Sequence, residues 1–246
     1  KIKITSVTLS ANITEIAANA FRGCTALTEI NFNEGLSKIG SWAFGNTKLV
    51  KVEFPDTLKS IGIYSFYNIT TLEQVDFAKI EKIDGNAFAN CTALCSTVTN
   101  NVLEIPETVT TVGANAFQNC KSIKRLYWYA VKLTSGGAGN MENPAFKGCT
   151  ALAQVRIYAP AKNIPSYFCY RAGRSIVLLT FNGTPVVETI GDYAFYQHRI
   201  QTLTLPDTVK KVGRETFRNN NLLKSITFGA NTATVEKLCF SFCNSL

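Results

Sequence analysis

Histidine, methionine and charged side chains are scarce in this chain of 246 residues. It has one histidine, His198, and one methionine, and only 17% of its residues are charged. A Ser–His or Cys–His catalytic pair would have to use His198, and no other catalytic arrangement stands out. The sequence therefore predicts a protein that is not an enzyme. His198 stands where other segments of the chain carry Cys, which favours a core or near-surface residue over a catalytic base.

Patterns typical of metal sites and membrane spans are also lacking. The eight cysteines contain no C-x-x-C spacing, and the pairs Cys91/Cys95 and Cys239/Cys243 have no second pair or His nearby. We therefore expect no metal and no cofactor. No apolar run approaches the roughly 20 residues that cross a bilayer, which argues against direct membrane insertion. No signal peptide is visible, so we expect a mature or trimmed extracellular product.

What the sequence does contain is one motif repeated from end to end. Its centre is Val-Gly-x-x-Ala-Phe-x-x-Cys-x-x-Ile in the copy at residues 112–123. Successive copies lie 23, 22, 22, 29, 29, 22, 27, 22 and 23 residues apart. The equivalent Phe of each copy is Phe21, Phe44, Phe66, Phe88, Phe117, Phe146, Phe168, Phe195, Phe217 and Phe240. A near-constant period over this length is typical of a repeat array.

Each copy predicts a short strand, a turn and a tight return. Segments such as Leu126-Tyr127-Trp128 alternate apolar and polar residues, as a strand with one buried face does. Pro-Asp-Thr or Pro-Glu-Thr then supplies turn residues. A Gly such as Gly113 recurs before the Ala-Phe pair, and it permits either a tight turn or a close approach of two backbone segments. Coils of this size must be covered by their neighbours, so we expect stacked parallel strands.

The repeat I-G-x-x-A-F-x-x-C-x-x-L-x-x-I-x-F-P-x-x-V resembles the BspA-like, or Treponema-type, class of leucine-rich repeat. Residues 61–77, 112–128 and 212–228 carry it most clearly. The resemblance implies a β-rich, α/β-type, right-handed solenoid of about ten coils of 22–23 residues, with short parallel strands on its concave face. It also implies a secreted or surface-anchored protein, because family members are typically of that kind and several are implicated in adhesion.

The period predicts one leucine-rich repeat domain over residues 1–246, with insertions near 95–102 and 130–144. The second insertion has a Gly-rich core at Gly136, Gly137 and Gly139 and is expected to be a surface loop. Leu246 fills the Leu position of the tenth copy, just before a further strand would begin. Since solenoids usually carry capping repeats, we expect this sequence to be a fragment of a longer chain.

The cysteines follow the repeat more than they follow a disulfide pattern. Five of them lie three residues after the repeat Phe, where other copies have Thr, Ile or Asn, so packing explains them. These five are Cys24, Cys91, Cys120, Cys149 and Cys243. Cys95, Cys169 and Cys239 lie at other positions. Cys95 falls in an insertion and is the strongest candidate of the three for an exposed thiol or a disulfide, but the sequence leaves open whether any of the three forms one.

Charge is unevenly distributed along the chain. Residues 1–122 carry 10 Lys/Arg and 11 Asp/Glu, whereas residues 123–246 carry 15 and 6, so net charges of −1 and +9 add to +8. The basic half favours anionic partners. Nucleic acid is not expected, because the basic residues are scattered singly and no nucleic-acid-binding motif accompanies them.

One group of exposed strand residues predicts a ligand site. If Leu126 aligns with Val155, then Tyr127 lies beside Arg156 and Tyr129 beside Tyr158 on the outer face. Tyr and Arg are enriched at interaction hot spots. The candidate ligand-binding residues are Lys124, Arg125, Tyr127, Tyr129, Arg156 and Tyr158. Alternatively, Tyr127 and Arg156 form a solvent-facing pair that only stabilises the sheet.

These observations predict a non-catalytic extracellular or cell-surface module that mediates adhesion by binding a protein, such as a host extracellular or surface protein. Carbohydrate binding by the exposed tyrosines is an alternative, because tyrosine rings can stack on sugars. A structural spacer or assembly module that acts through its solenoid ends is another. The sequence leaves these alternatives open.

Overall fold

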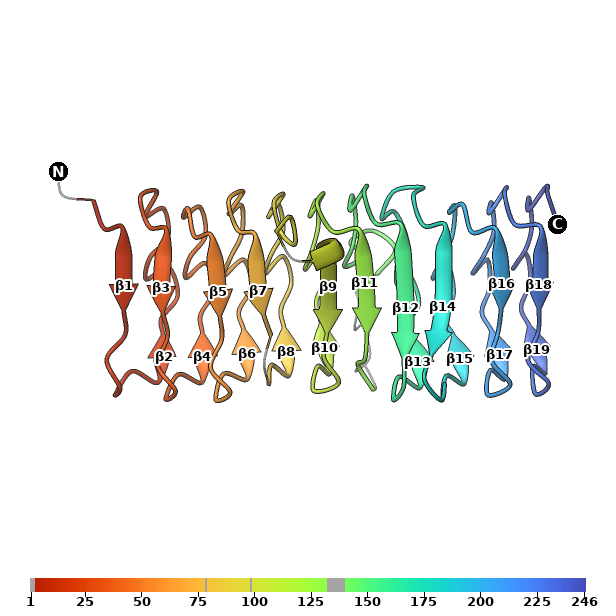
Figure 1. Cartoon of the computed structure of the whole chain (residues 1–246), viewed down its shortest axis with the longest axis horizontal. Coiled ribbons are helices and arrows are strands. Elements are labelled where there is room, and N and C mark those ends of the chain that lie inside the picture. The colour runs from red at the N-terminus through yellow and green to blue at the C-terminus, as the bar shows by residue number, and fades with distance from the viewer. Residues whose placement is uncertain (1–2, 78, 98, 132–139) are drawn as a thin grey trace.

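The computed structural model describes residues 3–77, 79–97, 99–131 and 140–246. Over these ranges the chain winds into a nearly straight row of coils, with its two termini at opposite ends (Figure 1). A regular coil contains a longer strand, a turn, a shorter strand and a return segment of consecutive turns. The only helix in the described residues is the 3-10 helix η1, Thr99–Asn101. The predicted β-rich repeat solenoid of about ten coils is confirmed.

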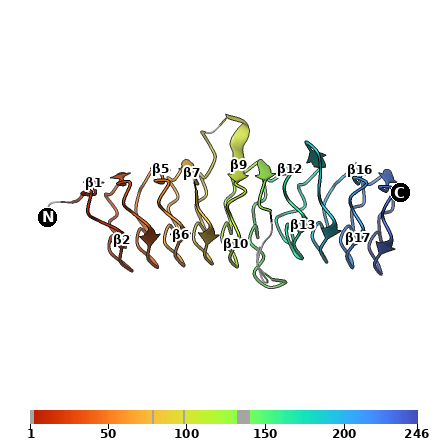
Figure 2. The ribbon, with the colours of Figure 1, turned by 90° about the horizontal axis from the view of Figure 1, so that it is seen from below.

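The longer strands lie side by side along one face of the row, which we call the long-strand face (Figures 1 and 2). Each pairs in parallel with a strand one coil away. They are β1 (Ser6–Thr8), β3 (Glu29–Asn31), β5 (Lys51–Glu53), β7 (Gln74–Asp76), β9 (Val102–Ile105), β11 (Arg125–Trp128), β12 (Gln154–Tyr158), β14 (Leu178–Asn182), β16 (Thr202–Thr204) and β18 (Ser225–Thr227).

The shorter strands form two further parallel sheets, β2-β4-β6-β8-β10 and β13-β15-β17-β19. Within the described residues no shorter strand connects β10 to β13. At that place the long strands β9, β11, β12 and β14 form one continuous sheet. The shorter strands are β2 (Glu15–Ile16), β4 (Lys38–Ile39), β6 (Ser60–Ile61), β8 (Lys82–Ile83), β10 (Thr111–Val112), β13 (Asn163–Ile164), β15 (Thr189–Ile190), β17 (Lys211–Val212) and β19 (Thr234–Val235).

The repeat phenylalanines form an aromatic ladder through the core. The ring centroids of Phe117 lie 5.6 Å from Phe88 and 5.4 Å from Phe146, with interplanar angles of 5° in both pairs. The side chains of all three are fully buried. Each ring is therefore covered by the coils before and after it, as the repeat period predicts.

Gly113 shows why the repeat carries glycine. A Cβ atom at this position would lie 2.4 Å from the backbone nitrogen of Gly85, in the preceding coil. The backbone of Gly113 does not have a positive φ angle. Of the two explanations that the sequence allowed, close approach of adjacent backbones is the correct one.

The assignment of Phe168 as the repeat Phe of the seventh copy is wrong by one residue. Ile164 pairs with Ile190, which places Cys169 opposite Phe195. The Cys169 amide donates to the carbonyl oxygen of Ala194 at 2.9 Å, as a repeat Phe does. Phe168 instead occupies the neighbouring Ala position, and its ring stands at 79° to that of Phe195. The large ring enters the core from the Ala position because the Phe position holds a small thiol.

The position three residues after the repeat Phe, which we call the donor position, faces a carbonyl group of the preceding coil. Cys120 donates from Sγ to the carbonyl oxygen of Phe88 at 3.2 Å, and Cys149 to that of Phe117 at 3.1 Å. Packing therefore explains these cysteines, as predicted. Cysteine also supplies a hydrogen-bond donor that an aliphatic side chain lacks.

Other residues at the donor position follow the same rule. The buried Asn220 donates from Nδ2 to the carbonyl oxygens of Phe195 at 2.9 Å and Phe217 at 2.8 Å. Ile69 has no donor to offer to the carbonyl group of Phe44 in the preceding coil. The hydroxyl of Thr47 donates to that carbonyl oxygen instead, at 2.8 Å. The donor position thus supplies a side-chain hydrogen bond to the buried carbonyl oxygen of a repeat Phe, in addition to the backbone amide that several of these oxygens already accept.

Cys95, the strongest candidate for an exposed or bridged thiol, is neither. All eight cysteines are free, and Cys95 is 3% exposed. Its amide still donates to the carbonyl oxygen of Glu73 at 2.8 Å, so the coil stays in register up to this residue. Its φ angle of 70° then turns the chain outward into the insertion, which leaves the thiol in the core. Burial raises the pKa of Cys95 to about 12.

His198 also occupies the donor position, as the residue pattern predicts, and it is buried. Its Nε2 lies 3.0 Å from the carbonyl oxygen of Cys169, and we assign the ring proton to this nitrogen. Burial lowers the pKa of His198 to about 4, although the backbone of Cys169 and Gly173 acts in the opposite direction. The imidazole is therefore a neutral core donor at neutral pH.

This geometry predicts an acid-sensitive contribution to stability. The unfolded chain protonates His198 near pH 6.5, whereas the folded chain resists protonation down to about pH 4. The stabilisation is complete above pH 6.5 and is lost as the pH falls toward 4, by up to about 3 kcal/mol. Urea unfolding of wild type and His198→Asn across this range checks the prediction. Asn can donate as Asn220 does but does not titrate, so parallel stability curves would contradict it.

Candidate functional site

The strand register brings most of the predicted ligand-binding residues together on the long-strand face. β11 pairs with β12 so that Tyr127 lies opposite Arg156 and Arg125 opposite Gln154. On the other side of β11, Tyr127 lies opposite Glu104 of β9. The predicted alignment is confirmed. The apolar residues of β11 point into the core, and the Arg and Tyr residues between them are half-buried on the outer face.

The aromatic rings of this group contact one another directly. Tyr129 stacks on Tyr158 with centroids 4.5 Å apart and an interplanar angle of 14°. The ring centroid of Tyr127 lies 5.6 Å from that of Tyr158, and the guanidinium carbon of Arg156 lies 5.2 Å from the centre of the Tyr127 ring. We call these four residues, Tyr127, Tyr129, Arg156 and Tyr158, the tyrosine–arginine island.

The other two predicted residues flank the island. Arg125 donates from Nε to Oε1 of Gln154 at 2.9 Å, which holds its guanidinium along the strand face. Lys124 precedes β11, and its side chain is exposed. Its carbonyl group accepts the amides of Ala153 and Gln154, so its backbone contributes to the sheet. Lys124 and Arg125 therefore extend the positive charge of the island.

Two members of the island, Tyr129 and Arg156, each keep one protonation state near neutral pH. Burial, together with Tyr158 and Glu104, raises the pKa of Tyr129. A hydrogen bond with Tyr158 raises the pKa of Arg156. The Tyr129 hydroxyl therefore stays neutral while the Arg156 guanidinium stays charged. The surface offers one permanent positive charge surrounded by aromatic faces and hydroxyl groups.

An acidic region of the long-strand face adjoins the island. A cavity of about 540 Å³ lies between them and is lined by Tyr127, Glu104, Asp76 and Thr99 among others. Thr99 belongs to η1 in the first insertion, which rises above the strand face beside β9 (Figure 2). This insertion therefore forms one wall of the cavity.

Only part of the second insertion, residues 130–144, lies within the described residues. Its Gly-rich core at Gly136, Gly137 and Gly139 lies outside the described residues. Met141, just after it, is exposed. The expectation of a surface loop at 130–144 remains a prediction.

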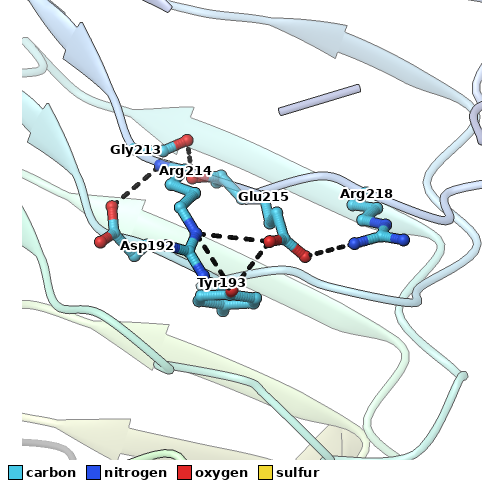
Figure 3. Close-up of polar contacts among 7 residues, drawn as sticks. Asp192, Tyr193, Gly213, Arg214, Glu215 and Arg218 are labelled. Carbon is cyan, nitrogen blue, oxygen red and sulfur yellow. Dashed lines mark hydrogen bonds and ion pairs between the residues drawn. The ribbon is translucent and has the colours of Figure 1, made fainter. Parts of the chain in front are cut away.

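Sequence reasoning missed a second aromatic cluster, which lies on the return segments. Tyr193 donates to Oε1 of Glu215 at 2.8 Å, Arg214 donates from Nη2 to the Tyr193 hydroxyl at 2.6 Å, and Arg218 donates to Oε2 of Glu215 at 2.7 Å (Figure 3). Tyr167 stacks on Tyr193 at 5.3 Å. The recurrence of Tyr two residues before the repeat Phe could have revealed it.

The Glu215 carboxylate is satisfied within this second cluster. Burial alone would raise the pKa of Glu215, but hydrogen bonds from Arg218 and Tyr193 outweigh it and lower the pKa overall. The carboxylate is thus paired on both oxygens. Its contacts join two consecutive coils, and we regard it as structural.

Within the described ranges, no group of three or more His, Cys, Asp or Glu side chains is arranged to hold a metal ion. In the same ranges, no helix has the length and apolar character needed to span a bilayer.

Comparison with known families gives a match along the whole chain. A family model described as "BspA type Leucine rich repeat region (6 copies)" matches residues 1–124, 95–185 and 139–246. No curated protein sequence matches this chain.

Solved structures show the same fold at low sequence identity. A leucine-rich repeat protein from Bacteroides ovatus has a TM-score of 0.55 and 19% identity, covering 99% of this chain and 78% of its own. The pneumococcal vaccine antigen PcpA has a TM-score of 0.51 and 24% identity, with coverages of 98% and 66%. A leucine-rich repeat protein of T. pallidum has a TM-score of 0.50 and 22% identity, with coverages of 79% and 77%. The chain thus spans slightly less than two thirds of PcpA.

Proposed function

The chain belongs to the BspA-type leucine-rich repeat family, and on that premise we propose that it is a non-catalytic binding module that attaches to a protein partner through the tyrosine–arginine island. Its repeat fold is of the kind that serves protein interaction. The partner is a host extracellular or surface protein, and the chain acts outside the cell or at its surface. The description of PcpA as a vaccine antigen supports that location.

The observation that carries this proposal is the packing of the island on a broad sheet. Three contacts of 4.5 to 5.6 Å, Tyr129–Tyr158, Tyr127–Tyr158 and Arg156–Tyr127, link the four residues on two neighbouring coils. Rigid Tyr and Arg side chains on a fixed backbone lose little entropy on binding, which is why they dominate interaction hot spots. The flanking Lys124 and Arg125 would accelerate encounter with an acidic partner.

The test is binding to a panel of immobilised host extracellular proteins and glycans. The variant changes Tyr127, Tyr129, Arg156 and Tyr158 to Ala. Loss of four central contacts is expected to weaken capture of the protein ligand by about 100-fold or more. Surface plasmon resonance measures the affinity, and thermal melts establish that both proteins are folded.

A matched control keeps the island and changes four exposed residues of the same face. Thr202, Thr204, Ser225 and Thr227 point outward from β16 and β18. Their replacement by Ala is expected to change affinity by less than about threefold, because such contacts are energetically near-neutral. Binding that survives the island variant, or that falls equally in the control, would refute the proposal.

Carbohydrate binding is the second candidate. The cavity beside Tyr127 is also lined by Asp76 and Glu104, and it combines an aromatic ring with carboxylates that can accept hydrogen bonds from sugar hydroxyl groups. Capture of glycans, but of no protein, in the same panel would favour it. No binding to either class would favour the spacer or assembly function.

A further inference from the structure

A recess on the return side of the solenoid follows from a change in chain length between coils. Most coils place two residues between the donor position and the next buried aliphatic residue, as from Cys120 to Ile123. The seventh coil has three, from Ala172 to Ile176. The second and eighth coils have only one, Lys48 between Thr47 and Leu49 and Arg199 between His198 and Ile200, but only the eighth follows a coil with three. The eighth coil is therefore short beside a longer neighbour, and we call the resulting hollow the coil-eight recess.

The recess contains two adjoining cavities of about 370 Å³ each. Arg174, Gln197 and His198 line both of them. The first is completed by Arg199, Asn219, Asn221 and Leu222. The second is completed by Tyr170, Arg171, Gly173 and Tyr196. Their volumes lie within the range of small-ligand pockets.

The charge of the recess is positive and uncompensated. Its lining includes Arg171, Arg174 and Arg199 but no carboxylate. In the described part of the chain no ion pair joins these three arginines to an acidic residue. By contrast, Arg214 and Arg218, on the ninth coil, both pair with Glu215. The recess thus attracts anions, whereas the neighbouring cluster is neutralised.

Uncharged polar groups make up most of the remaining lining. The amides of Gln197, Asn219 and Asn221 are there, and Asn219 donates from Nδ2 to the hydroxyl of Tyr196 at 3.3 Å. At the bottom His198 is fixed by its bond to the backbone carbonyl of Cys169. Amide and phenol groups both donate and accept, as sugar hydroxyl groups require of their partners.

We propose that the coil-eight recess binds an acidic saccharide, with a sulfate or carboxylate group held between Arg174 and Arg199 and the sugar hydroxyl groups on the amides. Arg suits this task because its planar fork matches such anions in two hydrogen bonds. A peptide carboxylate would leave the amides unused, and the only aliphatic lining residue is Leu222. This site lies on the return segments, whereas the island lies on the long-strand face, so the two sites are independent.

The experiment is calorimetric titration of the chain at about 0.15 M salt with four probes. They are a heparin tetrasaccharide, a hyaluronan tetrasaccharide, neutral cellotetraose and a hexaglutamate peptide. Binding is expected for one or both acidic sugars and not for cellotetraose. The heparin and hyaluronan arms distinguish sulfate from carboxylate recognition. Failure of both acidic sugars to bind overturns the proposal.

A charge-matched pair of variants locates the site. Arg174→Gln with Arg199→Gln is expected to weaken binding at least tenfold, since hydrogen bonds to charged groups are lost. Lys48→Gln with Lys121→Gln removes the same charge from the residue that follows the donor position in other coils. That control is expected to change affinity less than threefold. Equal weakening by both pairs means diffuse attraction and overturns the site.

A steric variant separates the cavity from its charge. Asn221→Phe keeps every charged residue and places a ring at the edge of the recess. It is expected to weaken binding of the acidic sugar at least tenfold, because the cavity is filled. Unchanged affinity overturns the site. Equally tight binding of hexaglutamate, abolished by the same arginine variant, overturns the assignment to saccharides.

Discussion

Replacement of Phe117 by Ala is expected to lower the free energy of unfolding by about 3–5 kcal/mol. Its ring is fully buried and stacks on Phe88 and Phe146, at 5.6 and 5.4 Å, and it also meets the edge of Phe77 at 6.1 Å. The neighbouring coils cannot close the gap, because their backbone spacing is fixed by the parallel strands on both sides. The change should therefore leave a cavity rather than be absorbed by repacking.

Denaturation in urea, followed by far-ultraviolet circular dichroism, measures this loss. Phe240→Ala is the control, since its ring is stacked on one side by Phe217 and is only partly buried in the last coil. We expect the control to cost less than half as much. A Phe117→Ala variant within about 1 kcal/mol of wild type would contradict the buried ladder.

Replacement of Asn220 by Leu is expected to cost about 2–5 kcal/mol, although Leu is more apolar and similar in size. The Asn220 side chain donates to the carbonyl groups of Phe195 and Phe217, and its Oδ1 accepts the Ile200 amide at 3.3 Å. Leu would leave the Phe195 carbonyl group and the Ile200 amide without partners, whereas the Phe217 carbonyl group keeps the backbone amide at position 220 and the Cys243 thiol, each at 3.3 Å. Each buried group without a partner typically costs about 1–3 kcal/mol.

The informative comparison is Asn220→Cys, which restores the residue found at the donor position of other coils. Cys can donate to one carbonyl group, as Cys149 does, so we expect it to recover at least 1 kcal/mol relative to Leu. Urea unfolding of the three proteins under one set of conditions gives both differences. If Leu is as stable as Asn, apolar packing alone explains the donor position.

Much of the fold could be predicted from the sequence because each coil repeats the same local requirement. The spacing of Phe88, Phe117 and Phe146 predicts their stacking directly. Alternation in 126–128 and 155–157 predicts the register that places Tyr127 beside Arg156. Both inferences need only the period of the repeat and the two-residue period of a strand.

The remainder could not be predicted, because it depends on contacts between unequal coils. The sequence motif places the repeat Phe of the seventh copy at Phe168, whereas the backbone register places that position at Cys169. Only the pairing of β13 with β15 shows which assignment is correct. Cys95 lies in an insertion by sequence count, yet its thiol is buried because the chain leaves the coil just after it. The coil-eight recess arises where a coil that is one residue short follows a coil that is one residue long, a relation that no single copy of the repeat reveals.

The interruption between the two sheets of shorter strands has a consequence for how such a surface can diversify. Where the described residues contain no strand to join β10 to β13, the coils are held in register by the sheet β9-β11-β12-β14 and by bonds between return segments, such as that from the Phe117 amide to the Ala145 carbonyl oxygen at 2.9 Å. Insertions at the position of the shorter strand would therefore not shift the backbone that carries the tyrosines. Sequence drift can change the length of the chain at that position, while the outer residues of β11 and β12 are selected separately for a new ligand.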